Sequence, residues 1–349
     1  MLHFPKTSGR TDHWILPHPL YHHFHALNSV HIEDIEDNGI VREVESRFDG
    51  QGFKDLPKNN DWPKILFIGD SFVQANQVGV DESFGNLLEK KLNNIDIVNF
   101  GCSSWSSILY YNWLKNNLSK LKGVKSVYVF YFSNDPYDTA SYFNDADDPQ
   151  KTDDITFNAY AAREGKKISA VKNWLYKNVR LYYLASNVKD NWLKMKKTRL
   201  RREIDDKDWE SIFAGVKTSY QKKAMDLEKM YLTKINDFLK KNSVQFCLVY
   251  IPAAQQVARN ENSVGSAFYS REFLDVMYHS SVLQDQLRVL AEKNGFPFID
   301  LTGSLREFKR SEPETLLYLK SDGHFSLQGH RVVADILLKE MKGRAGSLN

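Results

Sequence analysis

The chain has little cysteine. Its 349 residues include only Cys102 and Cys247, which lie far apart and in apolar surroundings. Two cysteines cannot build a disulfide framework, and they cannot form a cysteine-based zinc cluster. We therefore expect two buried free thiols, in a protein whose fold depends on a hydrophobic core.

Long apolar runs are also lacking. No stretch of 18 apolar residues occurs, so the sequence predicts no transmembrane helix. The first twenty residues mix Lys6, Arg10 and Asp12 with prolines, unlike a secretory signal peptide. We expect either a cytoplasmic protein or one whose anchor lies outside this sequence.

Net charge is low as well. The formal charge of +3 is too small to indicate nucleic-acid binding by itself. The charge is uneven, however, because residues 166–202 hold twelve lysines and arginines against one acid, Asp190. Trp174, Tyr182 and Trp192 lie among these cations. The segment suits a helical cap over a cleft, or a surface that contacts an anionic glycan or phospholipid headgroups. No nucleic-acid-binding module accompanies it.

Residues 1–60 lack periodicity and contain seven of the ten histidines. Neighbouring side chains in His22-His23-Phe24-His25 point in different directions, and no cysteine or spaced carboxylate joins them as metal ligands would. We therefore expect an irregular N-terminal segment that packs on the main domain, and no metal or cofactor.

From residue 64 onward, strand and helix patterns alternate, which predicts a parallel sheet with helices on both faces. The expected strands are 64–69, 95–99, 124–132, 244–251 and 296–300. The expected helices are 83–93, 106–121, 217–242, 271–294 and 327–342. Residues 61–349 should thus form one three-layer α/β/α domain with about five mostly parallel strands. A basic helical insertion, about 136–216, interrupts it.

Ser71 directly follows the first predicted strand, where Gly69-Asp70-Ser71 ends an apolar run. In an open α/β sheet, ligands bind at this carboxyl edge. A serine nucleophile needs a base and a group that orients the base. The late segment Asp322-Gly323-His324 offers both, with His324 as base and Asp322 as its partner.

Two further segments follow the next strands and reach the same edge. Gly101 lies after the second strand and can present an unobstructed N–H. Asn134 follows the third strand and carries a side-chain amide. Together with the Ser71 N–H, these groups predict a three-donor oxyanion hole. We expect Asp70, Asp135 and His330 to have structural roles.

These blocks resemble those of the SGNH, or GDSL-like, hydrolase superfamily. Ser71, Gly101, Asn134 and His324 match its four lettered positions, and Asp322 matches the triad acid. The stretches 67–72, 79–84 and 322–330 are similar to members that act on bacterial envelope sugars. Ser133 departs from the glycine that many members carry there. The acid stands two residues before the histidine, as in the polysaccharide acetyltransferase and acetylesterase branch, rather than three residues before it at Ser321.

The resemblance implies acyl-ester chemistry through an acyl-enzyme on Ser71, either hydrolysis or transfer of an acyl group, acetyl above all, to a carbohydrate hydroxyl. It favours the bacterial envelope over the cytoplasm as the location. Two alternatives remain open. One is a lipid or lysophospholipid acyl hydrolase, and the other is a glycan-binding module that keeps the fold without catalysis. An intact serine, histidine and aspartate set argues against the pure binder.

The basic segment generates a first prediction. Replacing its cluster with glutamine at Lys194, Lys196, Lys197 and Arg199 should leave turnover of a small acetyl ester unchanged. Activity on a polymeric or membrane-presented substrate should fall and lose its salt dependence, because exposed charges act within about a Debye length. Initial rates on both substrates across a salt series measure this. Equal loss on the two substrates would make the segment part of the fold instead.

Overall fold

The structure, a computed structural model, describes residues 15–54, 61–149, 154–167, 209–215, 218–258, 270–320 and 323–345. Its centre is a five-stranded sheet in the order β6-β5-β7-β8-β9, with every neighbouring pair parallel. The strands are β5 (Lys64–Gly69), β6 (Asp96–Gly101), β7 (Val124–Tyr131), β8 (Gln245–Tyr250) and β9 (Phe298–Asp300). The predicted sheet is confirmed.

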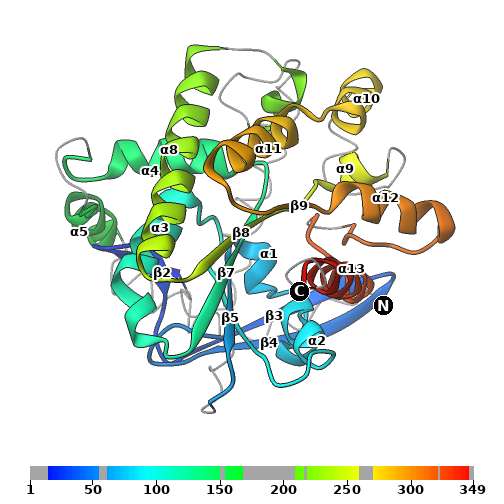
Figure 1. The fold of residues 1–349 in the computed structure, drawn as a ribbon, viewed down its shortest axis with the longest axis horizontal. Coiled ribbons are helices and arrows are strands. Elements are labelled where there is room, and N and C mark those ends of the chain that lie inside the picture. Colours follow the sequence, from blue (N-terminus) through cyan, green and yellow to red (C-terminus); the bar gives the residue numbers. More distant parts are fainter. Residues whose placement is uncertain are drawn as a thin grey trace, which may run out of the picture.

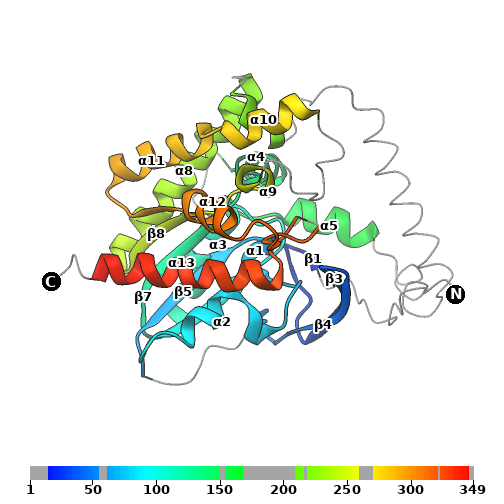
Figure 2. The same ribbon diagram turned by 90° about the vertical axis from the view of Figure 1, so that its right-hand side faces the viewer.

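Helices cover both faces of this sheet (Figures 1 and 2). One face packs against α3 (Ser107–Asn117), α8 (Ser219–Lys241) and α11 (Val282–Asn294), and the other against α1 (Ser71–Gln74), α2 (Phe84–Glu89) and α13 (Leu327–Ala345). In β5, Leu66 and Ile68 enter the first core, whereas Ile65 and Phe67 enter the second. Alternate side chains of a strand point to opposite faces, so a doubly covered strand is apolar throughout. No helix in the described ranges is both long and apolar enough to cross a membrane.

The sequence predicts one helix over 271–294, but the structure has two helices in this range. The first, α10 (Arg271–His279), stops at Ser280, which is extended with φ −72° and ψ 128°, and α11 begins at Val282. Arg306 donates to the carbonyl of Tyr278, so tertiary contacts satisfy the exposed end of α10. Periodicity alone does not report such a break.

The predicted insertion is partly described. It begins with α4 (Asp135–Asp145) and continues with α5 (Asn158–Lys167) and η3 (Trp209–Ala214). Most of the basic segment, 168–202, lies outside the described residues. Outside the insertion, α9 (Ala254–Val257), α12 (Thr302–Ser311) and the short helical turn η1 (Val80–Glu82) were not predicted, whereas η2 (Leu118–Lys120) lies within the predicted helix over 106–121.

The N-terminal segment is not irregular where the structure describes it, which corrects that prediction. It forms two antiparallel hairpins, β1 (Ile15–His18) with β2 (His22–His25) and β3 (Ser29–Asp37) with β4 (Ile40–Phe48). Asn38 and Gly39, at φ 53° and 81°, connect β3 to β4. An Asn-Gly pair is the usual signal for such a two-residue turn, and it was present in the sequence.

The histidines of the segment attach it to the sheet domain. Both ring nitrogens of His25 are engaged, one 2.7 Å from the Gly52 carbonyl and the other 2.9 Å from the Gln74 side-chain amide. His23 Nε2 lies 2.8 Å from the Ser103 carbonyl. Burial lowers the pKa of His25 to about 3, so its ring is neutral. These side chains therefore connect β2 to α1 and to the loop after β6.

Gly101, at the end of β6, lies directly against the backbone of α1. A Cβ at this position would be 2.1 Å from the Gln74 nitrogen and 2.7 Å from the Asp70 carbonyl oxygen. Backbone atoms, unlike side-chain atoms, cannot move away by a change of rotamer. Glycine is therefore required here by the approach of the α1 turn to β6.

Gly101→Ala should consequently displace the α1 turn and lower the free energy of unfolding by about 3 kcal/mol, as overpacking against backbone does. Gly303→Ala is the matched control, because nothing lies within 4 Å of a Cβ at this position in α12. It should stabilise the protein by about 0.5–1 kcal/mol. Urea denaturation of both variants measures the difference, and equal stability of the two would contradict the packing described here.

Candidate active site

Ser71 and His324, 253 residues apart in the sequence, meet at the carboxyl edge of the sheet. Ser71 Oγ lies 2.7 Å from His324 Nε2. Both residues are partly exposed, so a solute can reach the pair. A serine hydroxyl that donates to an imidazole nitrogen has a base within proton-transfer distance. The structure thus brings together the two residues that the sequence places at opposite ends of the domain.

The turn before Ser71 fixes its position. A Cβ on Gly69 would come within 2.4 Å of the Val73 side chain and 3.1 Å of Phe130, so the chain turns tightly there. The Asp70 carboxylate accepts from the Phe72 N–H at 2.9 Å and caps α1. Ser71 is the first residue of that helix and therefore leaves the sheet edge in a set direction.

His324 lies on a closed turn between α12 and α13. Its carbonyl accepts from the Leu319 N–H at 2.7 Å, and the Leu319 carbonyl accepts from the Gly323 N–H at 3.2 Å. Just beyond it, the Asp37 carboxylate of β3 accepts from the Leu327 N–H at 3.0 Å, at the start of α13. The N-terminal hairpin therefore supports the histidine turn.

Phe72 links the loops around the pair. Its ring centroid lies 4.9 Å from that of His324, 4.8 Å from that of Phe132 and 5.0 Å from that of Phe325. Phe132 belongs to the loop after β7, so loops after β5 and β7 and the histidine turn share one aromatic contact. The strand order places β5 and β7 side by side at the switch point of the sheet, where ligands bind in such folds.

The other predicted site residues have these positions. Asp322 and Ser321 lie outside the described residues. Gly101 is buried at the end of β6, paired with Gly69. Asn134 is partly exposed before α4, and its amide donates to the Asp138 carboxyl at 2.7 Å. Ser133 is fully buried, and no hydrogen bond to its hydroxyl is found.

Sequence reasoning missed a group of acids beneath this edge. Asp135 and Glu228 have no exposed surface, Asp70 is 2% exposed, and Asp138 is half-buried. The Glu228 carboxyl accepts from the Ser107 hydroxyl. Within the described part of the chain, neither oxygen of Asp135 has a hydrogen-bond partner. Glu228 lies in α8, 90 residues beyond Asp138, so no local sequence signal connects them.

Burial raises the pKa of each of these carboxyls, and for Asp135 and Asp138 the charges of neighbouring acids raise it further. Burial is the main cause, and it raises the pKa of Asp70 to about 6, of Glu228 to about 7 and of Asp138 to about 8. The pKa of Asp135 is raised well above its usual value, by burial and then by the charges of Asp70, Glu228 and Asp138. Asp138 therefore retains its proton at neutral pH, Glu228 is partly protonated, and Asp70 is mostly ionised.

His330 has the structural role expected of it. It is 1% exposed, and its Nδ1 accepts from the Phe84 N–H at 3.2 Å at the start of α2. Burial lowers its pKa to about 3, so the ring is neutral. Within the part of the chain that the structure covers, no three histidine, cysteine or acidic residues are placed to hold a metal ion. Cys102 and Cys247 are buried free thiols, as predicted.

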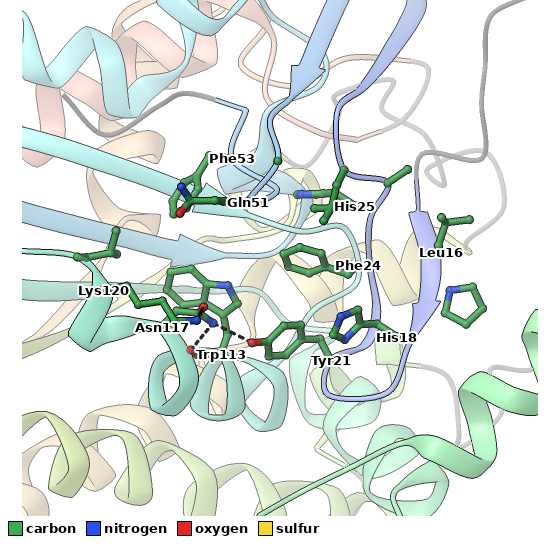
Figure 3. A pocket seen from close by; sticks show the side chains of 15 residues that line it. Leu16, His18, Tyr21, Phe24, His25, Gln51, Phe53, Trp113, Asn117 and Lys120 are labelled. Atoms are coloured by element: carbon green, nitrogen blue, oxygen red, sulfur yellow. Dashed lines mark hydrogen bonds between the residues drawn. The ribbon is translucent and has the colours of Figure 1, made fainter. Parts of the chain in front are cut away.

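A cavity of about 510 Å³ is lined by residues of the N-terminal segment and of α3 (Figure 3). Phe24 and Tyr21 from the N-terminal segment meet Trp113 and Asn117 of α3 there. Asn117 donates to the Tyr21 hydroxyl at 2.8 Å. The cavity is thus formed between the first hairpin and the end of α3, and its lining includes neither member of the pair.

No protein-family model and no curated protein matches this chain. Weak overlaps with solved structures include an α/β hydrolase from the metagenome of Lake Arreo (16% identity, 79% of this chain and 94% of that one, TM-score 0.40). They also include an acetylxylan esterase from Geobacillus stearothermophilus (14%, 80% and 93%, 0.40) and a lipolytic G-D-S-L family protein from Veillonella parvula (11%, 79% and 96%, 0.39).

The buried groups predict how stability depends on pH. Neutral buried histidines, whose lowered pKa values lie well below 6.5, make the protein more stable as pH rises toward about 6.5. Above that pH, the folded chain still binds the protons of Glu228, Asp138 and Asp135, which the unfolded chain has released. These carboxyls lower the free energy of unfolding from about pH 4 up to their raised pKa values, and above about pH 6.5 the histidines no longer oppose them. The free energy of unfolding should therefore fall between about pH 6.5 and 8, as measured by urea denaturation.

Glu228→Gln keeps an acceptor for Ser107 and removes one of these protons. It should flatten the pH dependence between about pH 5 and 7.5, where Glu228 exchanges its proton, and raise the free energy of unfolding at pH 8.5 by on the order of 1–3 kcal/mol, since one pKa unit corresponds to about 1.4 kcal/mol. Asp226→Asn, exposed on the same helix, is the control and should leave the slope unchanged. An unaltered slope in Glu228→Gln would show that this carboxyl is ionised in the folded state.

Proposed function

We propose that this protein is a serine-dependent esterase or O-acyltransferase that acts on acyl esters, acetyl esters of a carbohydrate above all. The observation that carries the proposal is the 2.7 Å contact between Ser71 Oγ and His324 Nε2 at the carboxyl edge of a parallel sheet. A hydroxyl with a base at this distance is the minimal unit of nucleophilic acyl transfer.

In the first step, Ser71 Oγ attacks the ester carbonyl carbon while its proton moves to His324 Nε2. The carbonyl π electrons move to the oxygen and form a tetrahedral oxyanion. When the oxyanion collapses, the ester C–O bond breaks and His324 protonates the departing alcohol. The products are the free alcohol and an acyl group bound to Ser71. Asp322, two residues before the histidine, is proposed to orient its ring.

The oxyanion requires donors near Ser71. We assign this role to the backbone N–H groups of Ser71 and Gly101 and to the Asn134 amide. Ser71 follows β5, Gly101 ends β6 and Asn134 follows β7, so these groups belong to three adjacent strands. Loss of one such donor typically lowers turnover by about 10²–10³-fold.

In the second step, His324 removes a proton from water or from a sugar hydroxyl, which attacks the acyl carbon and regenerates the Ser71 hydroxyl. Water yields hydrolysis and a sugar hydroxyl yields transfer. The resemblance of segments 67–72, 79–84 and 322–330 to proteins acting on bacterial envelope sugars supports a carbohydrate substrate and an envelope location. No metal or cofactor enters any of these steps.

Ser71→Ala should abolish labelling by a fluorophosphonate and turnover of p-nitrophenyl acetate, because it removes the nucleophile and leaves the turn intact. His324→Ala should be similarly inactive. Asp322→Asn should lose up to about 10⁴-fold through the wrong imidazole tautomer. Nitrophenol release, followed with and without an oligosaccharide whose mass is recorded, separates hydrolysis from transfer.

Circular dichroism and thermal unfolding of Ser71→Ala provide the folding control. An unlabelled Ser71 in the unmodified protein, together with no turnover of any acyl ester, would leave the pair a structural hydrogen bond and would overturn the proposal. Full activity in Asp322→Asn would mean that His324 works without this acid.

A further inference from the structure

Asn134 stands at the N-cap of α4, but its side chain does not cap the helix. An N-cap asparagine normally accepts from the N–H of the second or third helical residue with its side-chain oxygen. Here no such bond is formed. Instead, the amide nitrogen donates to Asp138 Oδ2 at 2.7 Å, and the buried Oδ1 atom has no hydrogen-bond partner among the residues that the structure describes.

The orientation of the Asn134 amide is therefore fixed by its nitrogen alone, through the hydrogen bond to Asp138. Its oxygen makes no bond that would fix it, so the contact with Asp138 is what places the nitrogen toward α4. An amide has two N–H groups, and one of them is used by Asp138. The second remains available for a ligand at the sheet edge.

We propose that Asp138 is a positioning residue, which accepts the Asn134 amide and thereby keeps an N–H of that amide directed at the oxyanion formed on Ser71. This inference rests on the proposed function. It assigns Asp138 no contact with the substrate. Its contribution to the reaction passes entirely through Asn134.

Asp138 is itself well placed to be a fixed acceptor. It lies in the first turn of α4, and its backbone N–H donates to the Asn134 carbonyl at 3.1 Å. Residues four apart on a helix face one another, which suits the 2.7 Å side-chain contact. The neighbouring Thr139 hydroxyl donates to Ser106 at 2.9 Å, so the turn is held against the start of α3. A rigid acceptor orients an amide more sharply than a mobile one.

A double-mutant cycle between Asn134 and Asp138 tests the proposal. Asp138→Ala should lower kcat for p-nitrophenyl acetate by about 10–100-fold with KM nearly unchanged. The reason is that an Asn134 N–H that points in another direction stabilises the oxyanion less. In the Asn134→Ala background, the same change should cost less than about 2-fold. If the two residues acted independently, the fold-losses in kcat of the two single variants would multiply in the double variant.

Two further variants remove the ambiguity of a folding defect. Asp138→Leu fills the side-chain volume without any acceptor, and it should reproduce the loss seen in Asp138→Ala. Asp138→Asn retains an amide oxygen that can accept, and it should recover most of the activity. Asp145→Asn, at the other end of α4, is the matched control and should behave as the unmodified protein.

The outcomes separate this inference from the proposed function. If Ser71→Ala has no effect on turnover, the proposed function fails. If turnover depends on Ser71 but the Asn134 and Asp138 effects multiply, or if Asp138→Leu is fully active, Asp138 is not a positioning residue. If Asp138→Asn is as impaired as Asp138→Leu while remaining folded, the hydrogen-bond acceptor is not what Asp138 contributes, and the proposal is overturned.

Discussion

The close approach of the α1 turn to β6 is the constraint on which the candidate site depends. At Gly101 the backbone of α1 occupies the space that any side chain would need, and Gly69 permits the tight turn that starts this approach. Ser71 is the first residue after the turn. Its hydroxyl therefore leaves the sheet from a backbone that is fixed by steric exclusion on one side and by the Asp70 cap on the other.

The edge that holds the Ser71 and His324 pair also has buried carboxyl groups beneath it, whose desolvation is unfavourable. Four carboxyls lie at or below the loops after β5 and β7, and burial raises the pKa of each of them. Such a group weakens the fold as pH rises. Raised pKa values of this kind concentrate at functional sites, because a site needs polar groups that a stable core would exclude. In this protein the clearest local consequence is the Asn134 amide, which is turned from helix capping toward Asp138.

The N-terminal segment is part of the site's support. His25 contacts Gln74 of α1, His23 contacts the Ser103 carbonyl, and Asp37 binds the first N–H of α13 after the histidine turn. Each contact reaches a different loop at the carboxyl edge. The hairpins thus connect the nucleophile turn, the loop after β6 and the histidine turn. Neutral histidines suit this role because one ring nitrogen donates while the other accepts.

The sequence by itself determined the sheet and pointed to Ser71 and His324 as candidate site residues. Apolar runs alternating with amphipathic helices predict a doubly covered parallel sheet, since strands buried on both faces must be apolar throughout. Ser71 and His324 were identifiable because they follow strand-end and turn patterns within a few residues. The hairpin at Asn38-Gly39 was also readable from its turn signal and was missed. Strand patterns and turn signals of this kind extend over only a few consecutive residues, so they can be recognised in the sequence.

Only the tertiary structure decided how those residues are supported. The α1 backbone requires a glycine at position 101, and Glu228 lies close to Asp135; both features depend on contacts between elements far apart in the chain. The Asn134 amide contacts Asp138 rather than a helix N–H, which is a choice between two nearby partners. Periodicity and motif spacing report which residues share a face. They do not report which atoms meet across it, because packing and burial select those contacts after the chain has folded.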